Sequence, residues 1–337
     1  MTKYSSVHSA SVQRLVELWA DRYVPHWPSF PVEKDFLNIL ELVEVALPAG
    51  RAATVAKVKR DLNFYTDSDL QRENLSSYVP SWMNLPKVER LSQLVRQVYD
   101  KTLDIYQHPP INAIAQSASP ILEMPPIEQV AKELEPVLLE LSEEFRSEDL
   151  HTLGFITTSF HFCTRFAIAQ LTQPELVLLT PYFKFIEEQV CMPWQRVCQA
   201  AARHHPDSQT MTLVQQMLPR TQEIAEIVYY RSAELYRTDR SCRGDLNEPG
   251  VMASTIRDLN VFQAYLWLSV LEGSTAAVEQ ELLPLCITVF PSIGVTWKLI
   301  RQVLQLLVEE LLTQVEPEQI YLLVPYTRSM LQMFSSL

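Results

Sequence analysis

Proline is abundant and glycine is scarce in this chain of 337 residues, which holds 22 prolines and only six glycines. Parallel α/β folds use glycine freely at phosphate-binding loops and strand ends, so this balance argues against them. Proline ends helices because it lacks the backbone N–H that a helix needs. Strand-like alternation of useful length is missing from the sequence, whereas apolar residues recur at helical spacing. The sequence therefore predicts an all-α protein.

The charge balance excludes several classes of partner. A net charge of −12 disfavours nucleic acid, which needs clustered Lys and Arg, and it also disfavours an anionic membrane surface. No apolar run is long enough for an integral membrane segment, and the N-terminus lacks the apolar core of a signal peptide. Five cysteines, an odd number at scattered positions, fit a reducing compartment. We expect a soluble cytoplasmic protein that can still dock at the periphery of a membrane complex.

A proline-rich segment divides the chain. Residues 108–126, HPPINAIAQSASPILEMPP, combine two Pro-Pro pairs with small polar residues. Proline at this density holds a segment extended and semi-rigid, so we expect a linker or a surface strap. It separates an N-terminal helical region, 1–107, from a helical domain, 127–337. Apolar stripes expected in the N-terminal region include Leu15, Val55, Leu94 and Val98.

Catalytic and metal-binding motifs are missing from the sequence. It has no glycine-rich phosphate loop, no G-x-S-x-G elbow, no H-E-x-x-H and no kinase signature, so we expect a protein that is not an enzyme. His204 and His205 are expected at a helix C-terminus, where imidazole can bind carbonyls. His161, in an apolar run, is expected to be a hydrogen-bonded core residue. No His/Cys set completes a zinc site, and buried thiols are expected at Cys163, Cys191 and Cys198.

Two stretches are expected to form helices with one apolar side. The stretch from Pro174 to His205 is expected to form one helix, with Glu187, Glu188 and Arg196 on its solvated side. Its apolar side should carry Tyr182, Phe183, Phe185 and Ile186. Further along, Glu309 and Glu310 belong to an amphipathic helix whose core positions are Val303, Leu306, Leu307 and Leu311.

The most informative stretch runs from Thr255 to Gly294, TIRDLNVFQAYLWLSVLEGSTAAVEQELLPLCITVFPSIG. An Arg257–Asp258 pair follows a turn-rich segment and precedes a long apolar helix, which Gly273-Ser274-Thr275 ends. A second apolar segment then leads to a turn at residues 290–295. This order resembles the phycobiliprotein family of cyanobacteria and red algae, whose pattern is Cys-x-Arg-Asp, a tyrosine-rich helix, a Gly-Asp or Gly-Ser/Thr break and a Leu-Gly-Val turn. The resemblance covers roughly residues 190–315 and implies a globin-like domain.

The resemblance also implies a site and a defect in it. The family carries its chromophore on a cysteine two residues before the Arg-Asp pair, and this chain has Thr255 there. Attachment is a thioether bond formed by a thiolate, which a threonine hydroxyl cannot replace. In the family the aspartate accepts hydrogen bonds from pyrrole nitrogens and the arginine holds a propionate, so Arg257 and Asp258 are candidate tetrapyrrole contacts. The alternative is that the pair only starts a helix, with Asp258 in its first turn.

Other residues of the expected chromophore loop offer little in place of the thiol. Cys242 lies thirteen residues before Thr255 in the sequence, and loop geometry would have to bring it into the pocket. Arg240 and Arg243 suit propionates or an acidic partner, although solvated loop arginines are the commoner case.

Three functions remain open. The first is a non-catalytic assembly or regulatory protein that binds phycobilisome or photosystem subunits through a chromophore-less domain, in the cytoplasm or at the thylakoid surface. The second is a carrier or sensor that holds a bilin or chlorophyll non-covalently. The third is a helical-repeat scaffold unrelated to photosynthesis, although the chain shows no fixed repeat period.

Overall fold

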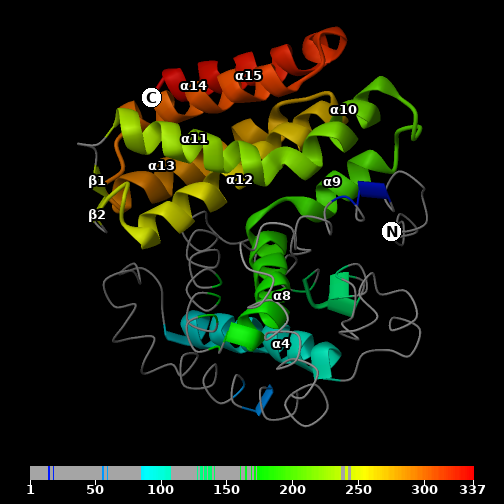
Figure 1. The fold of residues 1–337 in the computed structure, drawn as a ribbon, viewed down its shortest axis with the longest axis vertical. Helices are drawn as coiled ribbons and strands as arrows, with labels where there is room; N and C mark the ends of the chain where they lie inside the picture. The colour runs from blue at the N-terminus through cyan, green and yellow to red at the C-terminus, as the bar shows by residue number, and fades with distance from the viewer. Residues whose placement is uncertain are drawn as a thin grey trace, which may run out of the picture. The chain divides into compact units, whose positions relative to one another are not determined.

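A computed structural model gives the structure of the chain, shown in Figure 1. Its residues form two compact units. The first unit consists of Met1–Arg22 with Cys191–Leu337, and the second consists of Tyr23–Val190. The structure describes residues 85–107, 173–236, 240–241 and 244–337, with some residues within 14–18, 55–59, 127–140 and 160–171.

The domains expected from the sequence, an N-terminal helical region at 1–107 and a helical domain at 127–337, stay predictions. The expected linker at 108–126 lies outside the described residues and stays a prediction.

Helices dominate the described residues of the first unit, so the predicted helical class is confirmed. The exception is a short antiparallel strand pair, β1 with β2, in which Arg240 is opposite Asp245. The elements in chain order are α9 (Trp194–Ala201), α10 (Gln209–Met217), η3 (Leu218–Arg220), α11 (Thr221–Leu235), β1 (Arg240–Ser241), β2 (Gly244–Asp245), α12 (Pro249–Glu272), the π-helical turn η4 (Val278–Leu282), α13 (Leu283–Ser292), α14 (Trp297–Gln314), η5 (Pro317–Gln319) and α15 (Ile320–Ser335).

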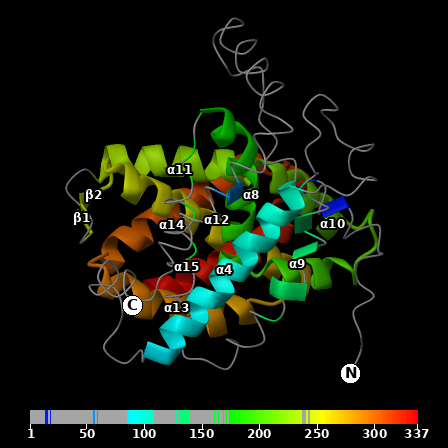
Figure 2. The same ribbon diagram turned by 90° about the horizontal axis from the view of Figure 1, so that it is seen from below.

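Helix α12 lies at the centre of the first unit, where it contacts α9, α10, α11 and α15 (Figure 2). Leu259, Phe262, Leu266, Leu268 and Val270 are all buried although they lie on different faces of the helix. A helix that is apolar around most of its circumference needs neighbours on several sides. The prediction of a largely buried central helix is therefore confirmed.

The two ends of α12 have local causes. Pro249 occupies the first turn, where its missing N–H would have had no partner in any case. Gly273 ends the helix in the left-handed conformation, with φ of 66° and ψ of 25°, which glycine adopts without steric cost. Because α12 begins at Pro249, Arg257 and Asp258 lie well inside the helix. The interpretation of Asp258 as a first-turn residue was wrong.

The segment between α12 and α14 contains a π-helical stretch and a tight turn. The N–H of Leu283 donates to the carbonyl of Val278, a π-helical bond just before Pro284, which has no N–H to donate. At the end of α13, Gly294 has a φ of 74°, and the N–H of Val295 donates to the Phe290 carbonyl at 3.0 Å. The turn expected at residues 290–295 is confirmed.

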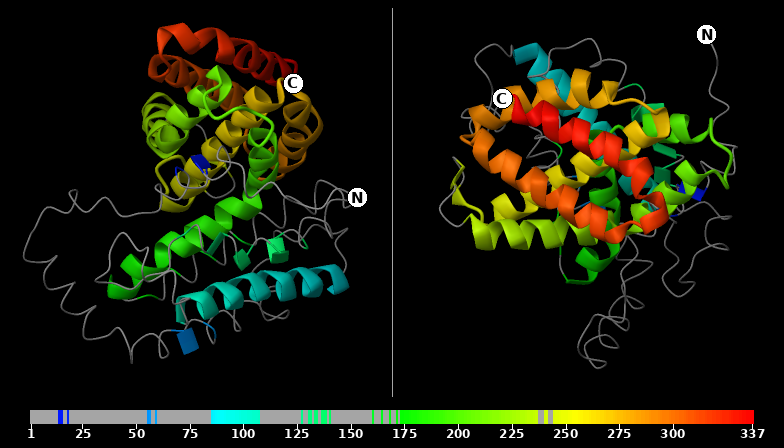
Figure 3. Two further views of the ribbon diagram at one scale, coloured as in Figure 1. Left: turned by 90° about the vertical axis from the view of Figure 1, so that its right-hand side faces the viewer. Right: turned by 90° about the horizontal axis from the view of Figure 1, so that it is seen from above.

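Helices α14 and α15 pack against each other, and α14 also packs against α11 (Figure 3). Thr296 caps α14, since its hydroxyl accepts a hydrogen bond from the Leu299 N–H at 3.3 Å. The rings of Phe334 in α15 and Phe262 in α12 meet edge to face with centroids 5.4 Å apart. The C-terminal helix thereby closes the core around α12.

The second unit contains helices α4 (Leu85–Gln107) and α8 (Gln173–Cys191). Its described core is centred on Tyr99, whose ring lies edge-on to that of Phe183 with centroids 5.5 Å apart. The Tyr99 hydroxyl donates to the Phe160 carbonyl at 3.2 Å, which satisfies a polar group in a buried place. Tyr99 and the apolar stripe of α4 beside it, which includes Leu94 and Val98, thus belong to a packed core.

Two expectations about residues 174–205 were wrong. The stretch is not one helix, because Met192 and Pro193 separate α8 from α9. Pro193 has no N–H to continue the hydrogen-bond ladder of α8, and it stands just before the first turn of α9 as its N-cap. Glu187 does not face water either, because its side chain is buried. The expected apolar side is confirmed, since Tyr182, Phe183, Phe185 and Ile186 are all buried.

Candidate functional site

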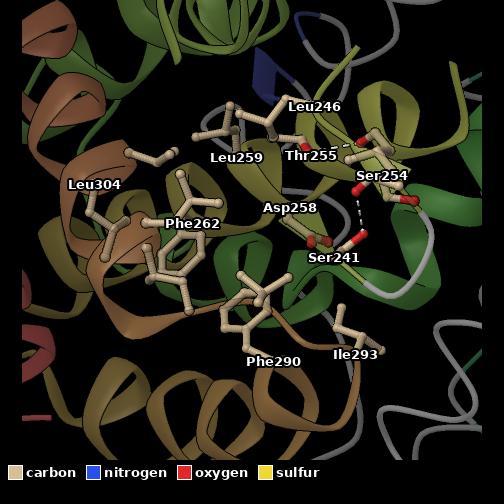
Figure 4. A pocket seen from close by; sticks show the side chains of 16 residues that line it. Ser241, Leu246, Ser254, Thr255, Asp258, Leu259, Phe262, Phe290, Ile293 and Leu304 are labelled. Atoms are coloured by element: carbon tan, nitrogen blue, oxygen red, sulfur yellow. Dashed lines mark hydrogen bonds between the residues drawn. The ribbon is translucent and has the colours of Figure 1, made fainter. Parts of the chain in front are cut away.

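A small apolar pocket lies beside the first half of α12 (Figure 4). Its volume is about 110 Å³. Figure 4 shows Phe262 and Leu304 toward one end and the hydroxyl residues Ser241 and Ser254 toward the other. The hairpin, α12, the end of α13 and α14 all contribute to the wall, which is formed by Ser241, Gly244, Leu246, Val251, Ser254, Thr255, Asp258, Leu259, Phe262, Phe290, Ile293, Val295, Leu299, Ile300, Val303 and Leu304.

Thr255, which stands where the phycobiliprotein pattern has its cysteine, lines this pocket. Its hydroxyl donates to the carbonyl of Val251 at 2.8 Å, the residue one turn earlier in α12. Such a bond to the preceding turn is usual for threonine inside a helix. The side chain therefore has a structural partner, and it offers the pocket no reactive sulfur.

Asp258 also lines the pocket, and its neighbour Arg257 neutralises it. The Arg257 Nε and Nη2 atoms donate to Asp258 Oδ1 at 2.9 and 2.6 Å. The Arg257 side chain is 18% exposed and that of Asp258 is 31% exposed, so the pair is partly shielded from water. A partly buried carboxylate needs a compensating charge, and here the same helix supplies it.

A linear tetrapyrrole does not fit the pocket as it stands. Sites for drug-sized ligands have volumes of roughly 300–1,000 Å³, well above that of this cavity. Thr255 has no thiol, and the arginine that would hold a propionate is bound to Asp258. Of the residues expected at a pigment site, Thr255 and Asp258 line this pocket and Arg257 does not. Their geometry does not match a pigment.

Cys286 is one of two cysteines whose side chains the structure describes, and it lies in α13, whose end lines the pocket. It is buried, and it does not belong to the pocket wall. Burial and the nearby Asp258 carboxylate raise the pKa of the Cys286 thiol well above its ordinary value. A thiol held protonated is a poor nucleophile. Cys242 and Arg243 of the preceding loop lie outside the described residues, and of Arg240 only the backbone, in β1, is described.

A second polar cluster lies at the other end of α12, and sequence reasoning missed it. Arg196 in α9 donates to both oxygens of Glu272, with Nη2 2.9 Å from Oε2 and 3.1 Å from Oε1. Its Nη1 also donates to Glu281 in the π-helical turn. The expectation that Arg196 simply faces water was wrong. No local sequence signal could have found this cluster, because Arg196 lies 76 residues from Glu272 and 85 residues from Glu281 in the sequence.

The electrostatics of this cluster favour a permanent charge on the arginine. Partial burial lowers the pKa of Arg196, but the hydrogen bonds and charges of Glu272 and Glu281 outweigh that effect and raise it. The buried Tyr265 hydroxyl donates to Glu281 Oε2 at 3.5 Å, and burial raises the pKa of that hydroxyl above its ordinary value. The tyrosine therefore stays neutral, and the cluster joins the three elements α9, α12 and η4.

The two adjacent histidines have different surroundings. His204 Nε2 lies 2.6 Å from the carbonyl oxygen of Leu271, in the last turn of α12, and donates to it. The expected contact with a carbonyl near a helix C-terminus is thus confirmed for His204, although the helix is α12 and not α9. His205 is exposed and accepts a hydrogen bond from the Asp207 N–H at 3.3 Å.

The remaining candidates are structural or undescribed. Arg231 in α11 bridges Glu309 and Glu310 of α14, with both N–O distances at 3.4 Å. Cys198 is half-buried and forms no disulfide. His161 and Cys163 lie outside the described residues, as does the side chain of Cys191.

Comparisons with known proteins add no relative. A scan against protein-family models found no matching family, and searches of curated proteins and of solved structures found no match either. The phycobiliprotein resemblance and the globin-like arrangement therefore stay predictions. None of the helices that the structure describes is both long and apolar enough to cross a membrane. Within the described part of the chain, no group of three or more His, Cys, Asp or Glu side chains is placed to hold a metal ion.

Proposed function

We propose that the protein is a non-catalytic assembly or regulatory factor of the cyanobacterial photosynthetic apparatus. In this proposal it binds phycobilisome or photosystem subunits through a chromophore-less, phycobiliprotein-like domain. The observation that carries the proposal is the Arg257–Asp258 pair, in which Nη2 lies 2.6 Å from Oδ1. The carboxylate that would hold pyrrole nitrogens in the family is here neutralised by its own neighbour, beside a cavity of only about 110 Å³.

The order of elements also supports the resemblance. The helices α10 and α11 precede a loop with a short hairpin, and the long central helix α12 ends at a glycine. A second apolar helix then leads through a Gly294 turn to α14. This is the order in which the phycobiliprotein pattern places its loop, central helix, glycine break and final turn.

A tetrapyrrole carrier remains the second candidate, because Thr255 and Asp258 do line the same pocket. For this function the pocket would have to widen and the Arg257–Asp258 pair would have to open. The helical-repeat scaffold has less support. In a solenoid each repeat contacts its neighbours in turn, whereas α9, α10, α11 and α15 all pack on one central helix.

The test compares the wild type with Asp258→Asn in cells that make phycobilins. We expect the two proteins to retain the same phycobilisome or photosystem subunits on affinity purification. The eluates should have no visible absorption band, and a zinc-treated denaturing gel should stay dark at this protein's mass. The variant should lose about 1 kcal/mol of stability, since Arg257 loses a partly exposed charged partner.

The carrier predicts a different result for the same pair of proteins. Pigment bound to the wild type and lost from Asp258→Asn, at an unchanged thermal midpoint, would contradict the assembly-factor proposal. A fluorescent band that survives denaturation would show that a covalent bilin is attached elsewhere in the chain. Subunits of unrelated complexes in both eluates would favour a scaffold outside photosynthesis.

A further inference from the structure

The pocket beside α12 is apolar over most of its wall. Five of the side chains that line it are almost fully buried, namely Leu246, Leu259, Phe262, Ile300 and Leu304. Every residue of the wall belongs to the first unit, so no residue of the second unit is needed to form the cavity. A water molecule inside a protein needs two to four polar partners, and these side chains offer none. This part of the pocket therefore favours an apolar occupant.

The hydroxyl groups at the other end of the pocket have already given up their protons. Each of them donates to a backbone carbonyl close by in sequence: Ser241 to Gly244 at 3.2 Å, Ser254 to Gly250 at 2.9 Å and Thr255 to Val251 at 2.8 Å. A hydroxyl has a single proton, so a group bonded in this way offers a ligand only its oxygen. The hydroxyl end of the pocket is thus an end of acceptors.

Asp258 adds a stronger acceptor at the same end. Figure 4 shows its carboxylate beside Ser241 and away from Leu304. Both hydrogen bonds from Arg257 end on Oδ1, at 2.9 and 2.6 Å, so within the described structure Oδ2 keeps its capacity to accept. A hydrogen bond to an ionised carboxylate is roughly twice as strong as one between neutral groups. The pocket therefore selects for a ligand that donates a hydrogen bond.

The charge of such a ligand follows from the Arg257–Asp258 ion pair, which is neutral as a whole. A cationic ligand would leave one uncompensated positive charge in a largely apolar cavity. An anionic ligand would add a negative charge and meet only acceptors. Burial of an unpaired charge costs far more than burial of a hydrogen-bonded neutral group. A neutral O–H or N–H group avoids both costs.

The volume of the cavity, about 110 Å³, limits the body of the ligand. An engineered protein cavity of about 150 Å³ lined by apolar side chains binds benzene. A single small ring or a short branched alkyl chain is therefore the size that fits here. A tetrapyrrole has four rings and exceeds this size.

We propose that this pocket binds a small, neutral, largely apolar molecule that carries one O–H or N–H group. The apolar body lies between Phe262 and Leu304, and the donor binds Asp258 Oδ2. This ligand class gives the protein a small-molecule site in addition to its proposed function. The site does not depend on whether the protein also binds phycobilisome or photosystem subunits.

Titration of the full chain with phenol, anisole and toluene tests the proposal. Phenol can donate a hydrogen bond, anisole can only accept one, and toluene does neither. Methyl NMR of a chain labelled at Ile, Leu and Val follows binding through the signals of Leu259, Val303 and Leu304, which line the pocket. We expect all three probes to shift these signals. Phenol should bind roughly tenfold more tightly than anisole, which is the effect of one hydrogen bond to a charged acceptor.

Asp258→Asn is the matched variant. Arg257 then donates to the amide oxygen in the place of Oδ1, so the amide NH₂ takes the place of Oδ2 and an acceptor becomes a donor. The preference for phenol over anisole should disappear, while the Kd of toluene should change by less than about twofold because toluene forms no hydrogen bond. Should this variant fail to fold, NOEs between the phenol ring and the Leu304 methyl groups locate the ring in the wild type.

The other outcomes overturn the proposal. Tighter binding of anisole than of phenol, or a preference for phenol that Asp258→Asn leaves unchanged, contradicts the assigned donor. Tighter binding of cyclopentylammonium, a cation of similar size, contradicts the neutral class. Shifts confined to methyl groups outside the wall, or no shift up to the solubility limit of the probes, contradict the site. These results leave the assembly-factor proposal standing, because co-purified subunits test that proposal separately.

Discussion

Replacement of Arg196 by methionine should destabilise the first unit of the protein. Arg196 joins α9 to Glu272 at the end of α12 and to Glu281 in the π-helical turn. Methionine keeps most of the aliphatic stem, and with it the packing, but removes the charge and all hydrogen-bond donors. The two carboxylates then lose their shared partner and repel each other.

The structure sets the size of the effect between two limits. Exposed ion pairs contribute about 0–1 kcal/mol, whereas removal of one partner from a buried pair costs about 3–5 kcal/mol. The side chains of Arg196, Glu272 and Glu281 are 37%, 17% and 43% exposed, so solvent screens the cluster in part. Glu272 also lies at the C-terminal end of α12, where the helix dipole disfavours an anion by about 0.3–1 kcal/mol. We expect a loss of about 2 kcal/mol.

The effect of Arg196 should not depend on pH in the ordinary range. Burial lowers its pKa, but Glu272 and Glu281 raise it further, so the folded-state pKa lies above the unfolded value. A group with a raised pKa contributes its full stability below the unfolded pKa, which for arginine lies far above the ordinary pH range. Loss of the proton from Arg196 therefore cannot weaken the cluster between about pH 6 and pH 9.

Urea unfolding, followed by circular dichroism, measures the change. Arg203→Met is the matched control, because Arg203 is an exposed arginine close in sequence, and it should change stability by less than about 0.5 kcal/mol. The double variant with Glu272→Gln should lose less than the sum of the two single changes, since both remove one interaction. A loss for Arg196→Met no larger than that of the control, or strict additivity in the double variant, would refute the reasoning.

Three further predictions follow from packing, backbone geometry and burial. Phe334→Ala should cost about 3–5 kcal/mol in urea unfolding, because it empties a fully buried site against Phe262, and a change below about 1 kcal/mol would contradict the assigned core. Gly273→Ala should cost about 1 kcal/mol in thermal unfolding from its positive φ alone, since the site has room for a methyl group; no loss would argue against the left-handed cap. Iodoacetamide should alkylate Cys198 before Cys286, whose pKa is raised by burial, as peptide mass mapping can show; the reverse order would contradict the burial of Cys286.

Features with local causes were predictable from the sequence. Gly273 and Gly294 mark the end of α12 and the turn before α14 because glycine alone adopts a positive φ freely. The apolar residues of α12 surround the helix, and that pattern already requires a central position. Thr255 excludes a thioether at its own position whatever the fold, since a threonine side chain has no sulfur.

Where local signals conflicted, the sequence predictions failed. The Arg257–Asp258 pair resembles a helix start, but Pro249 supplies an earlier one, and α12 begins there. The stretch 174–205 is periodic throughout, and Pro193 nevertheless divides it. Glu187 is charged and still buried. In each case the residue type allowed two placements. An Arg–Asp pair fits the start or the interior of a helix, and a charged side chain fits the surface or, with partners, the core. The tertiary structure decided which placement occurs.

Only the tertiary structure brings distant residues together. The contact of Arg196 with Glu272 and Glu281 spans 76 and 85 residues, and nothing near any of the three residues in sequence indicates it. The same holds for the pocket, where Asp258 and Thr255 line one cavity with residues of α14 only because α12 is packed among its neighbours. Amino-acid sequence determines the chemistry of each group and the local helix. The distances between groups on different helices, and hence the size of a cavity or the charge state of a cluster, depend on how those helices pack.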